Sequence, residues 1–572
     1  MIDYSSASVN PSAQSLVANQ VASRIHRKDA SLYGFSCEAQ ACARDYMGWA
    51  TLATQPPTPV ADIEQFAREM EARGMNTVLL IGQGGSTQAP MTLTKYNKID
   101  SNDVSFKTLD SVSPVRVRAI LAECDPERTL VIQSSKSGGT IEPSLVTKAV
   151  RSMLEQAMPK EHVVKHMVAI TDPGSDLERQ ALEEGWLRVF NGEPSVGGRY
   201  SALSVFGLVP AACVGIDLDT LIARAREAEA ACSADTSDNP AVVLASFLYD
   251  NLLHGRDKFS FLSPKRGRVL GLWIEQLVAE SLGKDGKGIL PNIEVDSLTL
   301  ADDPGDRTVI VYHTKTDLWD ERENFRKSLE FINPAIPRID YTVESVYDLA
   351  EHFVMWEYAI AMVGYLMEVC PFDQPDVQVA KTRVLDILAG GVTQPTFVQN
   401  GIDGVPIGPV EVSVSQALES KMFTHTLPEA IEALVSSLKP GDYFSINAFI
   451  PFTGEGRREA MEEVRHSLSD RYGLASCLEI GPRYLHSTGQ LHKGGPDTGV
   501  FLLISADETR DIPVDDDRSK SLGELERAQA QGDFAILSER GRRCLHVHLP
   551  DNSAITLRLL AKALRMGVNN HR

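Results

Sequence analysis

The sequence has little of what marks a secreted or membrane-spanning protein. Its eight cysteines are scattered, and only Cys37 and Cys42 lie close together, so it has neither a disulfide framework nor a zinc-binding spacing. Residues 1–20 contain no basic stretch followed by an apolar run, so we expect no signal peptide. The most apolar stretches, residues 200–216 and 358–369, are too short or too interrupted to cross a bilayer, and we expect buried helices there. These absences indicate a soluble protein of the reducing cytoplasm, with no membrane partner.

Positive charge is also scarce. The chain has 56 Lys and Arg against 77 Asp and Glu, a formal net charge of −21. A nucleic-acid-binding protein depends on clustered cations, so we expect no nucleic-acid partner. An anionic metabolite is not excluded, because a locally positive pocket can form in an acidic protein.

Strands and helices alternate through the middle of the chain, which predicts doubly wound α/β layers. The division we expect is a helical extension (1–60), two α/β domains (61–215 and 216–395) and a C-terminal domain (396–572). The stretch TQPTFVQNGIDGVPIGP (393–409) is marked by Gly and Pro and is predicted to be a linker. Beyond it, the order β-α-β-β-α-β predicts an α+β domain of the split βαβ type. Its expected strands are 442–450, 476–485, 499–505 and 543–549.

Two turns have the composition of a phosphate-binding site. After the apolar residues 130–132 come Ser134, Ser135, Lys136, Ser137, two glycines and Thr140. Hydroxyl donors, glycines that let backbone N–H groups approach an anion, and a following helix N-terminus all favour phosphate. An ordinary strand-to-helix turn is the alternative. A companion turn at 81–90, with Gly84, Gly85 and Ser86, follows the preceding strand and supports a sugar-phosphate site.

Five motifs in register give the sequence a resemblance to a known family. They are GGS (84–86), SKSGGT (135–140), VGGRYS (196–201), AESLGK (279–284) and PFDQPDVQVAK (371–381). Together they resemble glucose-6-phosphate isomerase, a family built on paired sugar-isomerase (SIS) domains, over about residues 60 to 395. HSTGQLHKGGPDTG (486–499) further resembles the isomerase half of bacterial transaldolase/glucose-6-phosphate isomerase fusions. The resemblance implies two flavodoxin-like SIS domains followed by the C-terminal domain.

The resemblance also implies roles for the motif residues in aldose–ketose isomerisation through a cis-enediol. Glu280 would be the base that carries the proton between C2 and C1, Arg199 would stabilise the enediolate, and Lys381 would act at the ring oxygen or the enediolate. Gln374 would bind substrate hydroxyls. The turns would bind the substrate through the residues Gly85, Ser86, Ser135, Lys136, Ser137 and Thr140.

The residue types fit these roles. A glutamate between the apolar GLWIEQLVA and a Gly turn is expected to be partly desolvated, which favours a base near neutral pH. The guanidinium of Arg199 stays charged, and the two glycines before it let the backbone pass close to a ligand. Gln374 and Lys381 would lie about 10.5 Å apart along one helix face. A solvated glutamate, a surface arginine and a capped surface helix are the alternatives.

The sequence departs from the family pattern in one respect. Most members carry a histidine some twenty to thirty residues beyond the base that helps to open the sugar ring, but residues 285–312 contain none. His486 and His492, in the Gly-rich C-terminal stretch, are the substitutes we favour; His313 and His352 are further possibilities. His546 and His548 share a strand face, and we expect them to be solvated and assign no metal site.

The function predicted from the sequence is the interconversion of glucose 6-phosphate and fructose 6-phosphate, in glycolysis and gluconeogenesis, without cofactor or metal. The alternatives are an isomerase of another phosphorylated aldose, such as mannose 6-phosphate, and a non-catalytic SIS-type sensor. A sensor has no need of Glu280, Arg199 and Lys381 together. The partner is a sugar phosphate, and the family is commonly dimeric, so a homodimer is expected.

Overall fold

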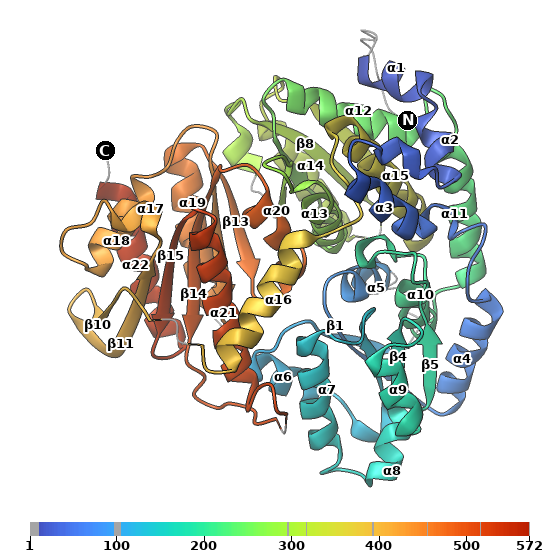
Figure 1. Ribbon diagram of the computed structural model, residues 1–572, viewed down its shortest axis with the longest axis horizontal. Coiled ribbons are helices and arrows are strands. Elements are labelled where there is room, and N and C mark those ends of the chain that lie inside the picture. Colours follow the sequence, from blue (N-terminus) through green and yellow to red (C-terminus); the bar gives the residue numbers. More distant parts are fainter. Residues whose placement is uncertain are drawn as a thin grey trace. The chain divides into compact units, whose positions relative to one another are not determined.

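The computed structural model describes residues 11–96, 104–293, 297–315, 317–391, 394–452, 454, 456–514 and 516–570. The chain divides into two compact units (Figure 1). The first contains residues 1–110, 124–147 and 151–374, and the second contains residues 111–123, 148–150 and 375–572. Across the described residues the strands form three sheets, two in the first unit and one in the second.

The first sheet has the flavodoxin-like order β2-β1-β3-β4-β5, and every neighbouring pair is parallel. Its strands are β1 (Thr77–Gly82), β2 (Ser105–Leu109), β3 (Thr129–Ser134), β4 (Met167–Thr171) and β5 (Arg188–Asn191). β1, β3 and β4 are buried along their whole length, as central parallel strands should be, and these are the three that the apolar runs predict. The edge strands β2 and β5, which are partly exposed, were not predicted from the sequence.

The second sheet repeats this order with four parallel strands, β7-β6-β8-β9. They are β6 (Lys258–Leu262), β7 (Leu290–Ile293), β8 (Arg307–Thr314) and β9 (Arg338–Val343). The prediction of two doubly wound parallel-sheet domains is therefore confirmed.

A large apolar core runs through the first unit, and a smaller apolar cluster lies around β8. The two longest apolar stretches form helices α10 (Val205–Cys213) and α15 (Leu349–Met367), which are buried as predicted. No helix in the described part of the chain combines the length and apolarity that a bilayer crossing requires. The other helices before Gln374 are α1 (Pro11–Ala18), α2 (Val21–His26), α3 (Cys37–Tyr46), α4 (Val60–Ala72), α5 (Gly85–Tyr96), α6 (Pro114–Leu121), α7 (Ile141–Leu154), α8 (Lys160–Val163), α9 (Asp176–Glu183), α11 (Leu218–Cys232), α12 (Pro240–Leu253), α13 (Arg268–Leu282) and α14 (Trp319–Ser328).

The sheet of the second unit is mixed, and the split βαβ prediction for it is wrong in topology. Its order is β10-β11-β15-β14-β12-β13, and its last four strands are all parallel. They are β12 (Tyr443–Phe449), β13 (Ala475–Ile480), β14 (Gly499–Ala506) and β15 (Arg543–Leu549). The error lies in residues 481–498, which were expected to continue one strand and turn back. They instead contain a 3₁₀ turn (Arg483–His486) and helix α20 (Gly489–Gly494), which make a crossover to a parallel strand.

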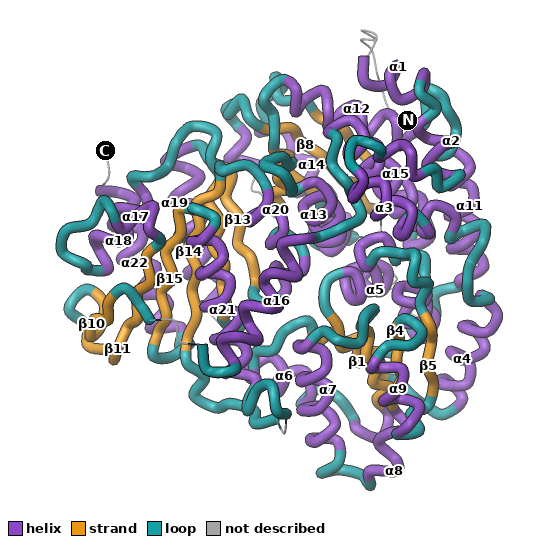
Figure 2. The backbone as a smooth tube through the Cα atoms, viewed as in Figure 1, coloured by secondary structure: helices purple, strands orange, loops and turns teal. Residues whose placement is uncertain are grey.

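Helices complete the second unit around its own apolar core. Helix α21 packs on β14 and β15 (Figure 2). The helices of this part of the chain are α16 (Pro375–Leu388), α17 (Gln416–Glu419), α18 (Leu427–Val435), α19 (Arg457–Tyr472), α20, α21 (Leu522–Glu539) and α22 (Ala554–Asn570).

The predicted linker at 393–409 is a β-hairpin in its described part. Strands β10 (Phe397–Ile402) and β11 (Val405–Val414) pair antiparallel, and β11 also pairs with β15. Asp403 and Gly404, with φ of 51° and 78°, make the two-residue turn that a right-twisted hairpin favours. The Asp-Gly pair was the signal for this turn, and the surrounding Gly and Pro residues obscured it. The finer division into four domains stays a prediction.

Candidate active site

The two predicted phosphate-binding turns lie side by side at the carboxyl edge of the first sheet. β1 and β3 are parallel neighbours, with Gly82 opposite Ser134, and each is followed by its turn and a helix. The strand order reverses at this pair, because β2 lies beyond β1 and β4 lies beyond β3. Ligands of open α/β sheets bind at such a reversal.

The turn after β3 has hydroxyl groups without partners. The Oγ atoms of Ser134 and Ser135 are buried and make no hydrogen bond. Thr140 is the N-cap residue of α7, yet its side chain makes no capping bond, so its hydroxyl is also available there. Buried hydroxyls are normally satisfied within the protein, so two of them beside a helix N-terminus are consistent with a role in binding an anion.

The other two residues of this turn are arranged differently. Ser137 is exposed, and its Oγ accepts a 3.3 Å hydrogen bond from Gly139 N. Lys136 is not a free cation, because its Nζ is bound to the carboxylate of Asp172 and lies 3.1 Å from Pro194 O. A direct phosphate contact by Lys136 would require this ion pair to open.

The turn after β1 connects the sheet to Arg199. Gly85 begins α5 and is packed so closely on the next motif that a Cβ there would overlap the carbonyl group of Gly198. Ser86 follows in the same helical turn and is buried. The sequence suggested that Gly85 allows close approach to a ligand. In the structure, a glycine is needed there because the main chain of Gly198, just before Arg199, leaves no room for a side chain.

Arg199 is buried, with 3% of its surface exposed. Its Nε donates to Ser281 Oγ at 2.7 Å and its Nη1 donates to Gln374 Oε1 at 2.9 Å. Its Nη2 donates to the carbonyl oxygens of Pro371 at 2.7 Å and Asp373 at 2.9 Å. All three guanidinium nitrogens are therefore held, which fixes the position of the charge.

Glu280 lies beside this guanidinium in the last turns of α13. Its Oε2 is 3.7 Å from Arg199 Nη1 and accepts a hydrogen bond of 3.1 Å from Gln276 Nε2. The side chain is buried, as expected for a residue that follows the apolar GLWIEQLVA. The structure thus brings the predicted base and the predicted enediolate stabiliser together in a buried contact.

Lys284 adds a second buried cation that the sequence reading did not assign. Its Nζ donates to Asp373 Oδ1 and Asp373 O, both at 2.6 Å, and also to Cys370 O. Burial lowers the pKa of Lys284, and the nearby charge of Arg199 lowers it further. Arg199 and Lys284 therefore both donate hydrogen bonds to carbonyl oxygens of the segment 370–374.

Gln374 and Lys381 differ from the expected arrangement. Gln374 contacts Arg199 in the first unit, but it precedes α16, which begins at Pro375, so the two residues do not share one helix face. Lys381 is half-buried on α16 and belongs to the second unit. Its predicted catalytic role stays a prediction.

The two histidines suggested for ring opening also belong to the second unit. His486 ends the 3₁₀ turn after β13 and is half-buried. His492 is 1% exposed, and both of its ring nitrogens lack hydrogen-bond partners. It packs against Tyr443, Tyr484 and Phe501, and burial holds its pKa well below the usual value. His492 is therefore the less accessible of the two histidines, and a ring-opening role for either one stays a prediction.

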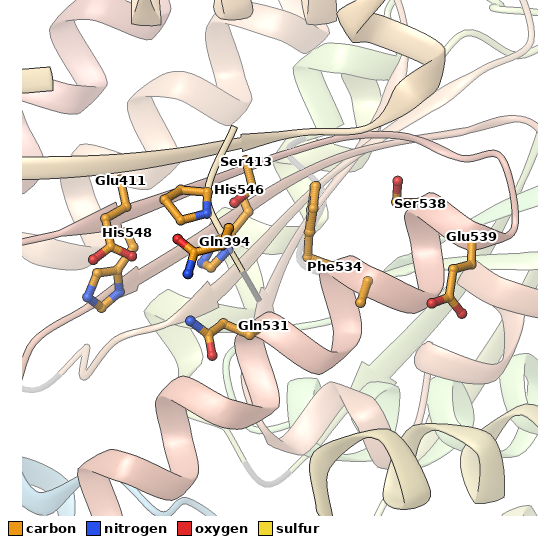
Figure 3. Close-up of a pocket in the computed structure, with 11 residues that line it drawn as sticks. Gln394, Glu411, Ser413, Gln531, Phe534, Ser538, Glu539, His546 and His548 are labelled. Atoms are coloured by element: carbon orange, nitrogen blue, oxygen red, sulfur yellow. The ribbon is translucent and has the colours of Figure 1, made fainter. Parts of the chain in front are cut away.

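His546 and His548 are buried, and the expectation that they are solvated is wrong. Their Nε2 and Nδ1 atoms, respectively, lie 2.8 Å from the same hydroxyl, Ser505 Oγ. Burial lowers the pKa of His546 to about 3. They line a pocket of about 280 Å³ on the second unit, together with Glu411 and Gln531 (Figure 3). Glu411, a carboxylate that lines this pocket, forms an ion pair with Arg527.

The sequence reading missed three residues that hold the site: Gln276, Ser281 and Lys284. Gln276 precedes Glu280 by one helical turn, a spacing that would have identified it. Ser281 and Lys284 are part of the AESLGK motif itself. What the sequence could not indicate is that residues 370–374, far away in the chain, supply the carbonyl oxygens that these cations need.

Comparison with known proteins identifies relatives for the part of the chain that carries this site. The sequence profile of phosphoglucose isomerase matches residues 68–297. Glucose-6-phosphate isomerase of Mycoplasmopsis pulmonis (strain UAB CTIP) is 30% identical over 390 residues, which are 60% of this chain and 90% of that protein. The enzyme of the same name from Parabacteroides distasonis is 28% identical over 395 residues, covering 60% of this chain and 87% of its own.

Two solved structures are similar as well. A hypothetical protein, TT0462, from Thermus thermophilus has a TM-score of 0.55 and 25% identity, over 66% of this chain and 98% of that one. A glucose-6-phosphate isomerase from Chlamydia trachomatis has the same TM-score with 19% identity, over 66% and 86% of the two chains, and it supports the fold alone.

Proposed function

Since the chain belongs to the phosphoglucose isomerase family, we infer that it interconverts glucose 6-phosphate and fructose 6-phosphate. The observation that carries this inference is the buried contact of Glu280 with Arg199, 3.7 Å apart. A reaction that moves a proton between adjacent carbons needs a base and a fixed positive charge in the same place. A sugar-phosphate sensor has no use for either, and an isomerase of another aldose is not favoured by any contact.

We propose that Glu280 removes the proton from C2 of the aldose and returns it to C1. Arg199 would stabilise the negative oxygen of the cis-enediolate that forms between these steps, because its charge is already positioned and need not reorganise. Gln276 donates to Glu280 and would orient its carboxylate toward the substrate. Ser281 and Gln374 would hold Arg199, and Gln374 would in addition bind substrate hydroxyls.

The phosphate of the substrate would bind in the two turns of the first sheet. The unpartnered hydroxyl of Ser135 and the free N-cap hydroxyl of Thr140 support this role, with Ser86 and Ser137 as further donors and Gly85 allowing backbone approach. Lys136 would contact the phosphate once its ion pair with Asp172 opens. Lys381 would act at the ring oxygen or the enediolate.

Ring opening would fall to His486. No histidine follows Glu280 where the family usually has one, and His486 is half-buried instead of enclosed. We further propose a homodimer located in the cytoplasm, and a particular relation to the isomerase half of transaldolase fusions. Size-exclusion chromatography with light scattering tests the dimer directly.

A coupled assay of the wild-type protein and the Glu280→Gln variant tests the proposed function. The wild-type protein should convert fructose 6-phosphate to glucose 6-phosphate. The isosteric amide cannot accept the proton, so we expect kcat to fall by about 10³-fold or more with an unchanged melting temperature. Turnover near the wild-type rate in the variant would remove Glu280 as the base.

A further inference from the structure

Two cysteines that are distant in the sequence meet a carboxylate beside the catalytic arginine. Among the residues that the structure describes, Cys42, Cys370 and Asp373 form a group whose sulfur and carboxylate oxygen atoms all lie within 4.8 Å of one another. Cys42 comes from α3, whereas the other two flank Pro371 and Phe372. Spacing in the sequence gave no sign of this group, because its two halves come from opposite ends of the first unit.

The chemistry of the group is that of a binding site for a soft divalent cation. Thiolates and carboxylates are both ligand types that Zn²⁺ accepts, and a fourth position would remain for water. The charges also balance, since three anionic ligands exceed a divalent cation by one charge and the ammonium group of Lys284 lies 2.6 Å from Asp373 Oδ1. A metal-binding carboxylate is usually oriented by such a hydrogen bond, and its second oxygen stays available for the ion.

The group is accessible from solvent. Cys42 is half-buried, and the Asp373 side chain is 44% exposed. Cys370 is buried beneath them, and its thiol contacts Ala39 O at 3.9 Å. An ion could therefore enter past Asp373 and meet the inner thiol last.

We propose that Cys42, Cys370 and Asp373 bind one Zn²⁺-type ion and that this ion inhibits the enzyme. Sulfur atoms on one tetrahedral zinc lie about 3.8 Å apart and a carboxylate ligand comes as close to them, so the ion would pull the Asp373 carboxylate and its segment toward the two sulfur atoms. The carbonyl oxygens of Pro371 and Asp373, which hold Arg199, are in the segment that must move. A displacement of about 1 Å in a positioned catalytic group costs on the order of 10²-fold in rate. The inhibition, but not the binding, rests on the proposed isomerase activity.

The binding is tested without substrate. The full-length protein, kept reduced with a phosphine so that no disulfide can form, is titrated with Zn²⁺ in competition with a chromogenic chelator. We expect one equivalent to bind with a Kd of about 1 μM or tighter. Co²⁺ in its place should give the near-ultraviolet charge-transfer band of thiolate ligation. The Cys42→Ser variant should lose the band and at least about 100-fold in affinity.

Cys37→Ser is the matched control. Cys37 lies on the same helix as Cys42 but is exposed and outside the group, so its substitution should leave binding and inhibition unchanged. Absence of saturable binding by the reduced protein, or equal binding by Cys42→Ser and the wild type, would overturn the site.

The inhibition is tested by a direct assay that uses no coupling enzyme, such as NMR of the two sugar phosphates. Saturating Zn²⁺ should lower kcat of the wild type and of Cys37→Ser by at least about tenfold, reversibly with EDTA, and leave Cys42→Ser unaffected. Equal inhibition of Cys42→Ser would overturn the inhibitory role. If the metal-free protein has no isomerase activity but still binds Zn²⁺, the proposed function is contradicted and the metal site is supported.

Discussion

At the scale of single residues, the active site depends on an arginine that is held through all three of its guanidinium nitrogens. Arg199 donates to a hydroxyl, an amide oxygen and two carbonyl oxygens, so its charge stays in place while the charge of the substrate changes. A lysine at this position would carry the same charge but could not make these bonds at once. We therefore expect Arg199→Lys to lower kcat by about 10² to 10³-fold.

The same substitution should lower the melting temperature, because Pro371 O and Asp373 O lose the hydrogen bonds that they accept from Arg199, and Asp373 O keeps only its bond from Lys284. Steady-state kinetics and thermal unfolding by circular dichroism measure both effects. A kcat within about threefold of the wild-type value would contradict the electrostatic role of Arg199.

Ser135 is predicted to contribute to substrate binding and not to folding. Its buried Oγ has no partner, so Ser135→Ala removes no bond from the protein and should leave the melting temperature unchanged. Loss of a hydrogen bond to a charged phosphate should raise KM by about tenfold with little change in kcat. Ser260→Ala removes another buried, unpartnered hydroxyl, in β6 of the second sheet, and should change neither constant. A KM equal to the wild-type value in Ser135→Ala would argue against phosphate in this turn.

The sequence was most informative about the residue types of the site and least about their partners. The motifs containing Arg199 and Glu280 indicated buried, functional groups, and the structure places both side chains in contact. The segment 370–374 could not be linked to them, since a carbonyl oxygen acts as an acceptor whatever its side chain. The burial of His492 could not be foreseen, because its glycine-rich stretch gives no sign of the aromatic rings that enclose it.

At the scale of elements, helix α5 packs directly against the 3₁₀ turn η5 (Gly198–Tyr200), so a shift of one would displace the other. Gly85 at the start of α5 leaves no room for a Cβ beside the carbonyl group of Gly198. Gly85→Ala should push the turn and move Arg199, lowering kcat by about 10²-fold while secondary structure is retained.

Gly197→Ala is the control for this prediction. Its φ is −64°, and an added Cβ would meet only Tyr200 Cδ2 at 3.9 Å, so we expect near wild-type kinetics. Kinetics and far-ultraviolet circular dichroism of both variants distinguish a displaced arginine from a misfolded sheet. Equal activity of the two alanine variants would show that the close packing at Gly85 is unimportant.

Elements were predicted where one pattern dominated. Buried parallel strands are apolar on both faces, so β1, β3 and β4 could be identified, whereas the partly exposed edge strands β2 and β5 could not. The crossover after β13 was missed because it is made by a short 3₁₀ turn and a six-residue helix, which leave only a weak periodic signal.

At the scale of the whole molecule, the stability of the first unit should depend on pH through a buried carboxyl group. Glu357 lies in α15, 3% exposed, and burial raises its pKa well above the usual value. Above the pKa of the unfolded chain, the folded state holds one more proton than the unfolded state. Its contribution therefore lowers stability as pH rises, by about 1.4 kcal/mol per pH unit, until the folded-state pKa is reached.

Glu357→Gln removes this titration and keeps the shape of the side chain. The variant should melt at a higher temperature than the wild type, and the difference should be larger at about pH 8 than at about pH 6. Differential scanning calorimetry at both pH values measures the two differences. A constant difference would mean that Glu357 is ionised in the folded protein.

The family relationship covers only part of the molecule. The matched profile ends at residue 297, and the full-length relatives account for 60% of the chain. The sequence predicted the two parallel sheets of the first unit from their alternating pattern, and it failed for the second unit, where the hairpin at 397–414 extends a parallel sheet. Strand order depends on which strands pair across long separations in the sequence. An apolar pattern predicts that a strand is buried, but it does not identify the strand that pairs with it.

The way in which main-chain oxygens grip Arg199 has an evolutionary consequence. Every residue has a carbonyl group, so replacing the side chain at 371 or 373 does not remove the acceptor that the guanidinium uses. As far as the contact with Arg199 is concerned, related chains can change these side chains as long as the path of the peptide is preserved, whereas an insertion or deletion there would be removed by selection. The carboxylate of Asp373 is constrained separately, because it pairs with Lys284.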